Sequence, residues 1–318
     1  MQTATDTLYI HTDSGEDPFD PVDSAAPGFL RWAAWKESAS AKSAQDLIVS
    51  VDDPLALAPA QRDRIVRRLR SDNMVIVESE RLLDKQALRV FSSGFGLARL
   101  DNNLCADGDG VTSLTVADGG HRGEYIPYSD RPLSWHTDGY YNSPERQIAA
   151  VILYCVEAAE TGGENALLDH ERLYIDLRRQ RPDLLLALME SDAMVIPPNV
   201  SAGKTIRPER VGPVFSRMSN GALHMRYTAR GRNIEWRGER ALEAAGWIKA
   251  YLASSEAPVL RHTLSRGQIL VTNNVLHNRT GFTDSANSQR LLYRARFFDR
   301  VAGTLPGDVL TELNRVEV

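Results

Sequence analysis

Trp135-His136-Thr137-Asp138-Gly139 places an imidazole and a carboxylate two residues apart. On an extended strand, residues i and i+2 point to the same face, so His136 and Asp138 are predicted to reach one metal ion while Thr137 points away. A third donor, His277, follows an apolar strand signal far along the chain. The intervening chain is long enough to return a distant strand beside the first. We therefore predict a fold in which two remote strands meet, with His136, Asp138 and His277 as metal ligands and catalytic centre.

Two imidazoles and one carboxylate are a donor set that suits non-haem iron(II). Three protein donors on one side leave the other positions of an octahedral metal open, as oxygen activation requires. The same donors also suit catalytic zinc, but such a site usually has a nearby general base of the kind that HExxH supplies, and the sequence contains no HExxH. Two alternatives to an iron oxygenase therefore stay open: a zinc hydrolase, and a binding or scaffold protein that has the same fold but no catalytic activity.

A His-x-Asp triplet alone is a weak signal, because His11-Thr12-Asp13 is a second copy. His11 is followed by a polar stretch near the terminus, where a fixed metal geometry is difficult to hold. The copy at His136 is flanked instead by Trp135 and by Tyr140-Tyr141, which are typical of a pocket wall. We favour the second copy as the metal-binding one.

The composition is that of a globular protein: 318 residues, 42% of them hydrophobic, are enough for one large domain or two modest ones. A formal charge of −5 argues against a general nucleic-acid binder. Two cysteines without CxxC spacing argue against a disulfide framework and favour a reducing compartment. No uncharged apolar stretch approaches the roughly 18 residues needed to cross a bilayer. We expect a soluble, cytoplasmic protein with a small-molecule substrate, no nucleic-acid or membrane partner, and a possible homo-oligomeric state.

Hydrophobic patterning predicts a mainly β fold with flanking helices, either a sandwich or an open barrel. Strands are predicted at 74–77, 148–156, 268–272 and 291–298, and helices at 58–70, 84–91, 169–189 and 239–253. Residues 1–58 are expected to form an extension packed on the core, and residues 59–318 the main domain. The polar, Gly/Asp-rich stretch 102–123 is a candidate lid, with a plain mobile loop as the alternative.

Arginines alternate along the strand predicted at 291–298, which places Arg290, Arg294 and Arg296 on one face with Leu292. Guanidinium groups that point into an interior are costly unless they meet anions, and a carboxylate is their natural bidentate partner. A dicarboxylate cosubstrate would satisfy one of them. The alternative is a solvated face of an amphipathic strand.

Together, the 135–138 segment, the turn Thr161-Gly162-Gly163-Glu164-Asn165, His277 and the pair Arg290 and Arg294 resemble the Fe(II)/2-oxoglutarate dioxygenase superfamily, in particular its taurine dioxygenase and clavaminate synthase-like branch. The resemblance implies a double-stranded β-helix (jelly-roll) core, iron held by His136, Asp138 and His277, and 2-oxoglutarate and O2 as cosubstrates. The implied reaction is hydroxylation, or desaturation, of an unactivated C–H bond with release of succinate and CO2.

The resemblance also assigns roles to single residues. Arg290 would bind the distal carboxylate of 2-oxoglutarate, and Arg294 an anionic group of the substrate. One position departs from the family pattern, because the Gly-Gly turn is commonly followed by an acidic residue and a threonine, whereas here Asn165 stands in place of the threonine. An amide can donate the same hydrogen bond, so Asn165 is assigned to 2-oxoglutarate. Asp138 favours hydroxylation or desaturation, because halogenating relatives carry a small residue there.

The substrate is expected to be a small polar or anionic metabolite such as an amino acid or a sulfonate. Tyr141 and Asn142 follow the metal segment, Tyr125 precedes it, and Arg226 belongs to the arginine-rich stretch 226–236. These four are candidate substrate residues, with packing or a solvated surface as the alternative for each. The sequence leaves open both the substrate and the choice between hydroxylation and desaturation.

Overall fold

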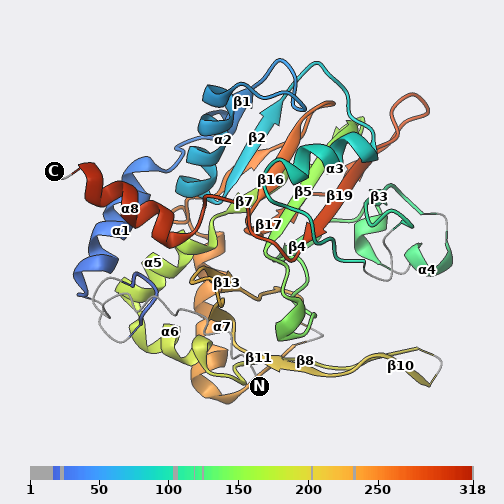
Figure 1. The fold of residues 1–318 in the computed structure, drawn as a ribbon. Helices are drawn as coiled ribbons and strands as arrows, with labels where there is room; N and C mark the ends of the chain where they lie inside the picture. The colour runs from blue at the N-terminus through green and yellow to red at the C-terminus, as the bar shows by residue number, and fades with distance from the viewer. Residues whose placement is uncertain are drawn as a thin grey trace, which may run out of the picture.

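The computed structural model describes residues 17–21, 25–102, 107–117, 119–123, 125–201, 203–231 and 234–316. The second His-x-Asp copy at 11–13 lies outside the described residues, as do parts of the expected N-terminal extension, of the candidate lid and of the arginine-rich stretch. Figure 1 shows a body of β-sheets with helices around it, from which the strand β10 projects.

The larger sheet is six-stranded and mixed. Its order is β1 (Ile48–Ser50), β2 (Met74–Glu78), β16 (Ile269–Thr272), β5 (Ala150–Glu157), β19 (Leu291–Phe297) and β3 (Thr112–Leu114). Only β1 and β2 pair in parallel; the other neighbours are antiparallel. The four predicted strands are confirmed as β2, β5, β16 and β19. Part of the candidate lid is the edge strand β3, paired with β19, so this part belongs to the sheet.

The second sheet is antiparallel, with the order β15 (Leu260–His262), β7 (Asn165–Leu168), β17 (Leu276–Arg279) and β4 (Leu133–His136). The remaining strands form small pairs and a triplet: β6 (Thr161–Gly162) with β18 (Phe282–Thr283), β9 (Asn199–Ser201) with β10 (Lys204–Arg207), β12 (Phe215–Arg217) with β13 (Leu223–Met225), and β11 (Arg210–Gly212), β8 (Met194–Ile196) and β14 (Glu235–Trp236).

The α-helices are α1 (Pro27–Ala39), α2 (Pro59–Asp72), α3 (Lys85–Ser93), α4 (Gly120–Gly123), α5 (His170–Gln180), α6 (Pro182–Met189), α7 (Gly238–Ala253) and α8 (Pro306–Val316), with 3-10 turns at Ala44–Leu47, Ile126–Tyr128 and Pro144–Arg146. The helices predicted at 58–70, 84–91 and 239–253 are confirmed. The single helix predicted at 169–189 is wrong, because the chain breaks into α5 and α6 at Arg181. Pro182 lacks an N–H and its ring clashes with a preceding helical turn, so it begins a new helix.

The six-stranded sheet is covered on both faces. Val75 and Val77 of β2 pack with α2 and α3 in one apolar cluster. The alternating residues Met74 and Ile76 pack in another cluster that includes Leu167 of the four-stranded sheet. Because successive strand residues point to opposite faces, this alternation lays the larger sheet between helices and the smaller sheet. The space between the two sheets is where the candidate site lies.

A third apolar cluster joins α1 to α5, α6 and α7. Phe29 and Trp32 of α1 are fully or almost fully buried in it, so this part of the expected N-terminal extension packs against the body of the protein. Lys36 of α1 is also buried, and its Nζ lies 2.8 Å from Asp169 Oδ2 and 2.5 Å from Glu171 Oε2. The N-terminal segment thus contributes both apolar area and a buried ion-pair network to the body of the protein.

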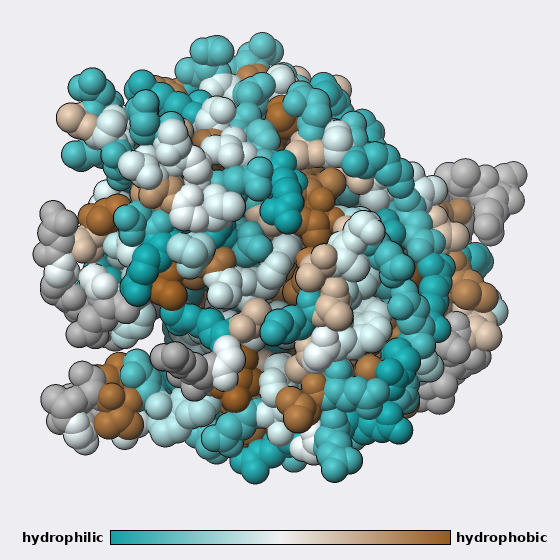
Figure 2. All heavy atoms as spheres, turned by 180° about the vertical axis from the view of Figure 1, so that it is seen from behind, coloured by the Kyte–Doolittle hydropathy of each residue, from teal (hydrophilic) through white to brown (hydrophobic). Residues whose placement is uncertain are grey.

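The face in Figure 2 is mostly hydrophilic, and its hydrophobic residues are scattered in small groups. The longest helix, α7, has 16 residues. Within the described ranges, no helix combines the length and the apolarity that a bilayer span requires.

Candidate active site

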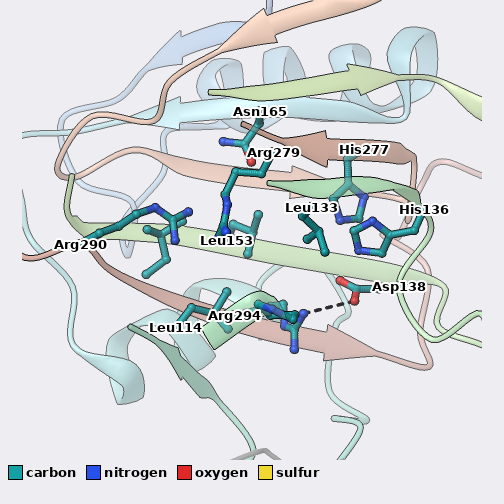
Figure 3. Close-up of a pocket in the computed structure, with 12 residues that line it drawn as sticks. Leu114, Leu133, His136, Asp138, Leu153, Asn165, His277, Arg279, Arg290 and Arg294 are labelled. Atoms are coloured by element: carbon teal, nitrogen blue, oxygen red, sulfur yellow. Dashed lines mark hydrogen bonds and ion pairs between the residues drawn. The ribbon is translucent and has the colours of Figure 1, made fainter. Parts of the chain in front are cut away.

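A pocket lies between the two sheets, and its lining comes from both. The six-stranded sheet and the residue before β19 contribute one wall, the four-stranded sheet and its flanks the other. The lining residues are Leu114, Pro127, Leu133, His136, Asp138, Leu153, Asn165, His277, Arg279, Arg290, Leu292 and Arg294. Figure 3 shows the two histidines and Asp138 towards one end and Arg290 at the other.

His136 and His277 face each other across neighbouring strands. They are direct register partners in the antiparallel pair of β4 and β17, and their ring centroids are 4.2 Å apart. The expectation that two strands remote in sequence meet at these residues is confirmed. Directly opposite residues on an antiparallel pair bring their side chains close together, which explains how two distant imidazoles share one end of the pocket.

Backbone carbonyls hold both imidazoles by the same nitrogen. His136 Nδ1 lies 2.9 Å from the Ser134 carbonyl oxygen, and His277 Nδ1 lies 3.0 Å from that of Val275. A carbonyl only accepts, so each Nδ1 carries a proton, and in the neutral form of each ring Nε2 keeps a lone pair for a metal. Burial, followed by the nearby His277, lowers the pKa of His136 to about 3. His136 is therefore neutral near pH 7, which is the form that binds metal.

Asp138 does not lie on the strand as expected. The strand β4 ends at His136, and Asp138 sits in the turn that follows. Thr137 does point away, because its Oγ1 accepts a hydrogen bond of 3.1 Å from the backbone N–H of Tyr227. The turn still delivers the Asp138 carboxylate into the pocket beside the imidazoles (Figure 3).

Two arginines face the Asp138 carboxylate. Oδ1 lies 3.3 Å from Arg294 Nη1 and 3.6 Å from Arg296 Nη1. Burial raises the pKa of Asp138, but these two cations outweigh it and hold the pKa well below the usual range. The other oxygen, Oδ2, is buried and has no hydrogen-bond partner among the described residues. The carboxylate is therefore ionised and keeps one oxygen unused.

The donor chemistry fits an iron(II) site. No three His, Cys, Asp or Glu side chains in the described part of the chain are already grouped as a metal site, and here the Asp138 carboxylate is engaged by arginines. However, two imidazoles whose Nδ1 atoms face backbone carbonyls, and an ionised carboxylate with an oxygen unpartnered among the described residues, line the same pocket. Two imidazoles and a carboxylate are what non-haem iron(II) requires from a protein.

Arg290 is a buried cation at the far end of the pocket. It is 5% exposed, and its guanidinium lies over the Phe282 ring at 4.9 Å from the centroid. No carboxylate of the described residues pairs with this guanidinium, and burial lowers its pKa. Gly163 of the Gly-Gly turn passes close by: a Cβ built there would lie 3.5 Å from Arg290 Nε. A buried guanidinium without an anion is a natural receptor for a carboxylate ligand.

Arg294 and Arg296 behave differently from each other. Arg294 lines the pocket, and its Nε is buried without a partner among the described residues. Arg296 lies deeper, pairs with Asp101, and donates a 2.9 Å hydrogen bond to the Tyr141 hydroxyl. The Nε of Arg296 also has no partner among the described residues, but Arg296 is not part of the pocket lining. Arg294 therefore has a donor left for a ligand in the pocket, whereas Arg296 links the Asp138 carboxylate to the surrounding protein.

Asn165 begins β7 and lines the pocket. Its Nδ2 donates a long bond of 3.4 Å to the Gly163 carbonyl oxygen. The amide lines the pocket with only this long contact, so its role toward 2-oxoglutarate stays a prediction.

The other four candidate substrate residues are not among the described residues that line the pocket. The Tyr141 hydroxyl accepts from Arg296, Asn142 Nδ2 donates to the Arg146 carbonyl oxygen at 2.9 Å, and Tyr125 packs at the edge of the cluster between the sheets. Arg226 donates to the backbone carbonyls of Met194, Gly212 and Pro213. Their polar contacts are therefore with other parts of the protein, and only Tyr141 reaches the site, indirectly through Arg296.

Sequence reasoning missed Arg279, which lines the pocket two residues after His277. The i, i+2 alternation applied to His136 could have found it, because a strand places His277 and Arg279 on one face. Reasoning also missed Asp101 and Asn274, whose contacts with the site come from distant parts of the chain and leave no local signal.

Arg226→Ala is expected to lower the free energy of unfolding by about 2–4 kcal/mol, because it removes the donor for four backbone carbonyls, those of Met194, Arg210, Gly212 and Pro213. Urea unfolding measures this. In the folded fraction, binding of Fe(II) and 2-oxoglutarate should match the wild type. A raised KM for an accepted substrate with unchanged stability would return Arg226 to a recognition role.

A family model described as "Taurine catabolism dioxygenase TauD, TfdA family" matches residues 37–296. The chain belongs to the TauD/TfdA family. The match includes the whole pocket lining, and it makes the protein a non-haem dioxygenase that uses Fe(II) and 2-oxoglutarate, as the sequence resemblance implied. The zinc hydrolase and the non-catalytic alternative are set aside by this membership.

Single relatives agree with the TauD/TfdA assignment. The chain is 30% identical over 199 residues to a uridine-5'-phosphate dioxygenase from Streptomyces sp, a match that covers 60% of this chain and 71% of the relative. An asparagine oxygenase structure with Fe(II), hydroxyasparagine and succinate has a TM-score of 0.57 and 19% identity, covering 84% of this chain and 91% of the other. The non-haem iron oxygenase OrfP, with iron and α-ketoglutaric acid, has a TM-score of 0.54 and 14% identity, covering 84% and 90%. The two structures show a shared fold.

Proposed function

We propose that His136, Asp138 and His277 hold Fe(II), that Arg290 and Asn165 bind 2-oxoglutarate, and that the enzyme hydroxylates a small anionic metabolite. The observation that carries the proposal is that one pocket has candidate metal donors at one end and a buried cation at the other. Two imidazoles and a carboxylate oxygen without a partner among the described residues lie at one end, and the buried Arg290 guanidinium, which meets no carboxylate in the described part of the chain, lies at the other (Figure 3). A dicarboxylate with a metal-chelating end matches both ends.

Bound iron, with 2-oxoglutarate and O2, supplies the oxidising power for an unactivated C–H bond. The protein positions the reactants. Backbone carbonyls keep both imidazoles in the tautomer that leaves Nε2 free, and Arg294 with Arg296 keeps Asp138 ionised. Leu133, Leu153 and Leu292 line the same pocket with apolar side chains, which would limit the access of water to the reacting centre.

The proposal includes a double-stranded β-helix for the core. Two facing sheets with the pocket between them, and the likeness to iron oxygenase structures, support this arrangement.

The proposed substrate class rests on Arg294. Its Nε is unpartnered next to the metal end of the pocket, where an anionic substrate group would meet it. Because the Streptomyces relative is a uridine-5'-phosphate dioxygenase, that nucleotide is first in the substrate panel, followed by amino acids and sulfonates. Asp138 fills the position that a halide would need, which favours hydroxylation or desaturation.

The test is an anaerobic titration of the metal-free protein with Fe(II) and then 2-oxoglutarate. Chelation of the keto acid should produce a weak visible charge-transfer band, and each accepted member of the panel should raise succinate release in air. Bound iron without the band would contradict the proposed 2-oxoglutarate site.

Asn165→Thr is expected to keep 2-oxoglutarate affinity within about threefold, whereas Asn165→Ala should weaken it by about tenfold, because one hydrogen bond to a charged group contributes roughly 1.5 kcal/mol or more. Titration of the charge-transfer band measures both. Equal affinity for the alanine variant and the wild type would remove Asn165 from the cosubstrate site.

A further inference from the structure

The side chain of Asn274 holds the backbone of Asp138. Its Oδ1 accepts the Asp138 N–H at 2.8 Å, and its Nδ2 donates to the Asp138 carbonyl oxygen at 3.0 Å. The same Nδ2 donates to the Ile148 carbonyl oxygen at 2.8 Å. All three residues are buried, so water does not compete for these bonds. One amide therefore satisfies both backbone polar groups of Asp138.

The bonds from the Asn274 side chain take the place of backbone hydrogen bonds between strands at Asp138. In the register of β4 with β17, the metal-side end of the pairing is His136 opposite His277. Asp138 lies beyond the strand, in a turn where Gly139 has a φ of 68°. Asn274 comes three residues before His277 on the opposite segment, so its amide continues the cross-strand connection that the backbone no longer makes. The contact thus ties the backbone of Asp138 to the segment that carries His277.

Asparagine suits this position for two reasons. Asn274 has a φ of 55°, in the left-handed region that Asn tolerates better than most residues. The amide also accepts and donates at once, whereas an aspartate only accepts and a glycine does neither. Glycine would adopt the same positive φ but make none of the three side-chain hydrogen bonds. Asn274→Gly therefore tests the hydrogen bonds without straining the backbone.

We propose that Asn274 is a positioning residue for the carboxylate ligand: it holds the Asp138 turn so that the carboxylate faces the two imidazoles. The inference rests on the proposed metal site at His136, Asp138 and His277. Partners that orient metal ligands commonly change metal affinity by 10–100-fold when they are removed.

Asn73 provides a matched control. It is also a buried, left-handed asparagine, with a φ of 54°. Its Nδ2 donates to Asp169 Oδ1 at 2.9 Å, and its Oδ1 accepts from Asn273 at 3.0 Å and from Arg300 at 2.5 Å. Asn73→Gly thus removes a comparable set of buried bonds on the same side of the fold without touching Asp138.

The experiment compares Mn(II) binding by wild type, Asn274→Gly and Asn73→Gly, using the loss of the free-ion EPR signal, with thermal unfolding of each metal-free protein. Asn274→Gly is expected to weaken Mn(II) binding by about tenfold or more. The Mn(II) affinity of Asn73→Gly should stay within about twofold of the wild type. Its melting temperature should nevertheless fall by about as much as that of Asn274→Gly. The Fe(II)/2-oxoglutarate band should shift only in the Asn274 variant.

Equal Mn(II) affinities for the two glycine variants would overturn the positioning role while the metal site stands. Failure of the wild type itself to bind Mn(II) or Fe(II) would instead overturn the proposed metal site. If Asn274→Gly does not fold, Asn274→Ser serves in its place, because its shorter hydroxyl cannot reach both backbone groups of Asp138. Wild-type Mn(II) affinity in that variant would equally overturn the inference.

Discussion

His277→Ala is expected to lower 2-oxoglutarate-dependent succinate formation by about 10³-fold or more. A bound metal contributes several kcal/mol to the stabilisation of a transition state, and each 1.36 kcal/mol is a factor of ten in rate. The imidazole is one of three proposed protein donors, and its direct register partner is a second one. The measurements are succinate release and Mn(II) affinity, which should fall together.

His262→Ala is the control for this variant. His262 lies on β15 of the same sheet, is also partly exposed, and its Nε2 lies 2.7 Å from Gln268 Oε1. It is not among the residues that line the pocket, so its loss should leave metal binding unchanged. Wild-type succinate release by His277→Ala would remove His277 from the ligand set. An equal loss in both variants would point to damage to the sheet.

Arg290→Gln is expected to weaken 2-oxoglutarate binding by roughly 10²-fold, because a bidentate pair with a carboxylate contributes about 3 kcal/mol. The 2-oxoglutarate affinity of Arg290→Lys should lie between those of Arg290→Gln and the wild type, because lysine keeps the positive charge but lacks the planar guanidinium that makes two parallel hydrogen bonds. The affinity comes from titration of the charge-transfer band with the Fe(II) protein.

A 2-oxo acid without a distal carboxylate, such as 2-oxobutanoate, tests the mechanism directly. Wild type and Arg290→Gln should bind it with similar, weak affinity, because the group that Arg290 is proposed to contact is missing. Arg261→Gln serves as the charge control, because Arg261 lies in β15 of the facing four-stranded sheet, is exposed and pairs with Glu164. If Arg290→Gln weakened both keto acids equally, Arg290 would have a structural role only.

Local patterns predicted most individual elements and several side-chain directions. Apolar β-branched runs identified β2, β5, β16 and β19, and strand alternation along 290–296 identified inward-facing arginines. Such patterns succeed because a strand or helix buries one face by its own period. The same logic failed at Pro182, where a local backbone restriction overrode the helical spacing, and at Asp138, where a turn replaced the expected strand.

The substrate candidates show where local reasoning stops. Arg226 and Tyr141 were suggested by composition and by proximity in sequence, but their polar atoms bind carbonyls and Arg296 in the surrounding walls. A buried arginine has similar sequence surroundings whether it meets a ligand or the backbone. Only the positions of its acceptors distinguish the two.

By itself, the sequence indicated the family and the arginine-bearing strand and supplied the proposed metal donors, because these depend on residue identity and on short periodic spacing. The tertiary structure alone decided that His277 pairs with His136, that Arg296 meets Asp101, and that Asn274 holds the Asp138 turn. These contacts join residues more than a hundred positions apart. They arise from the register of strands within and between two packed sheets, which is set by the collective burial of many apolar residues and not by any local segment.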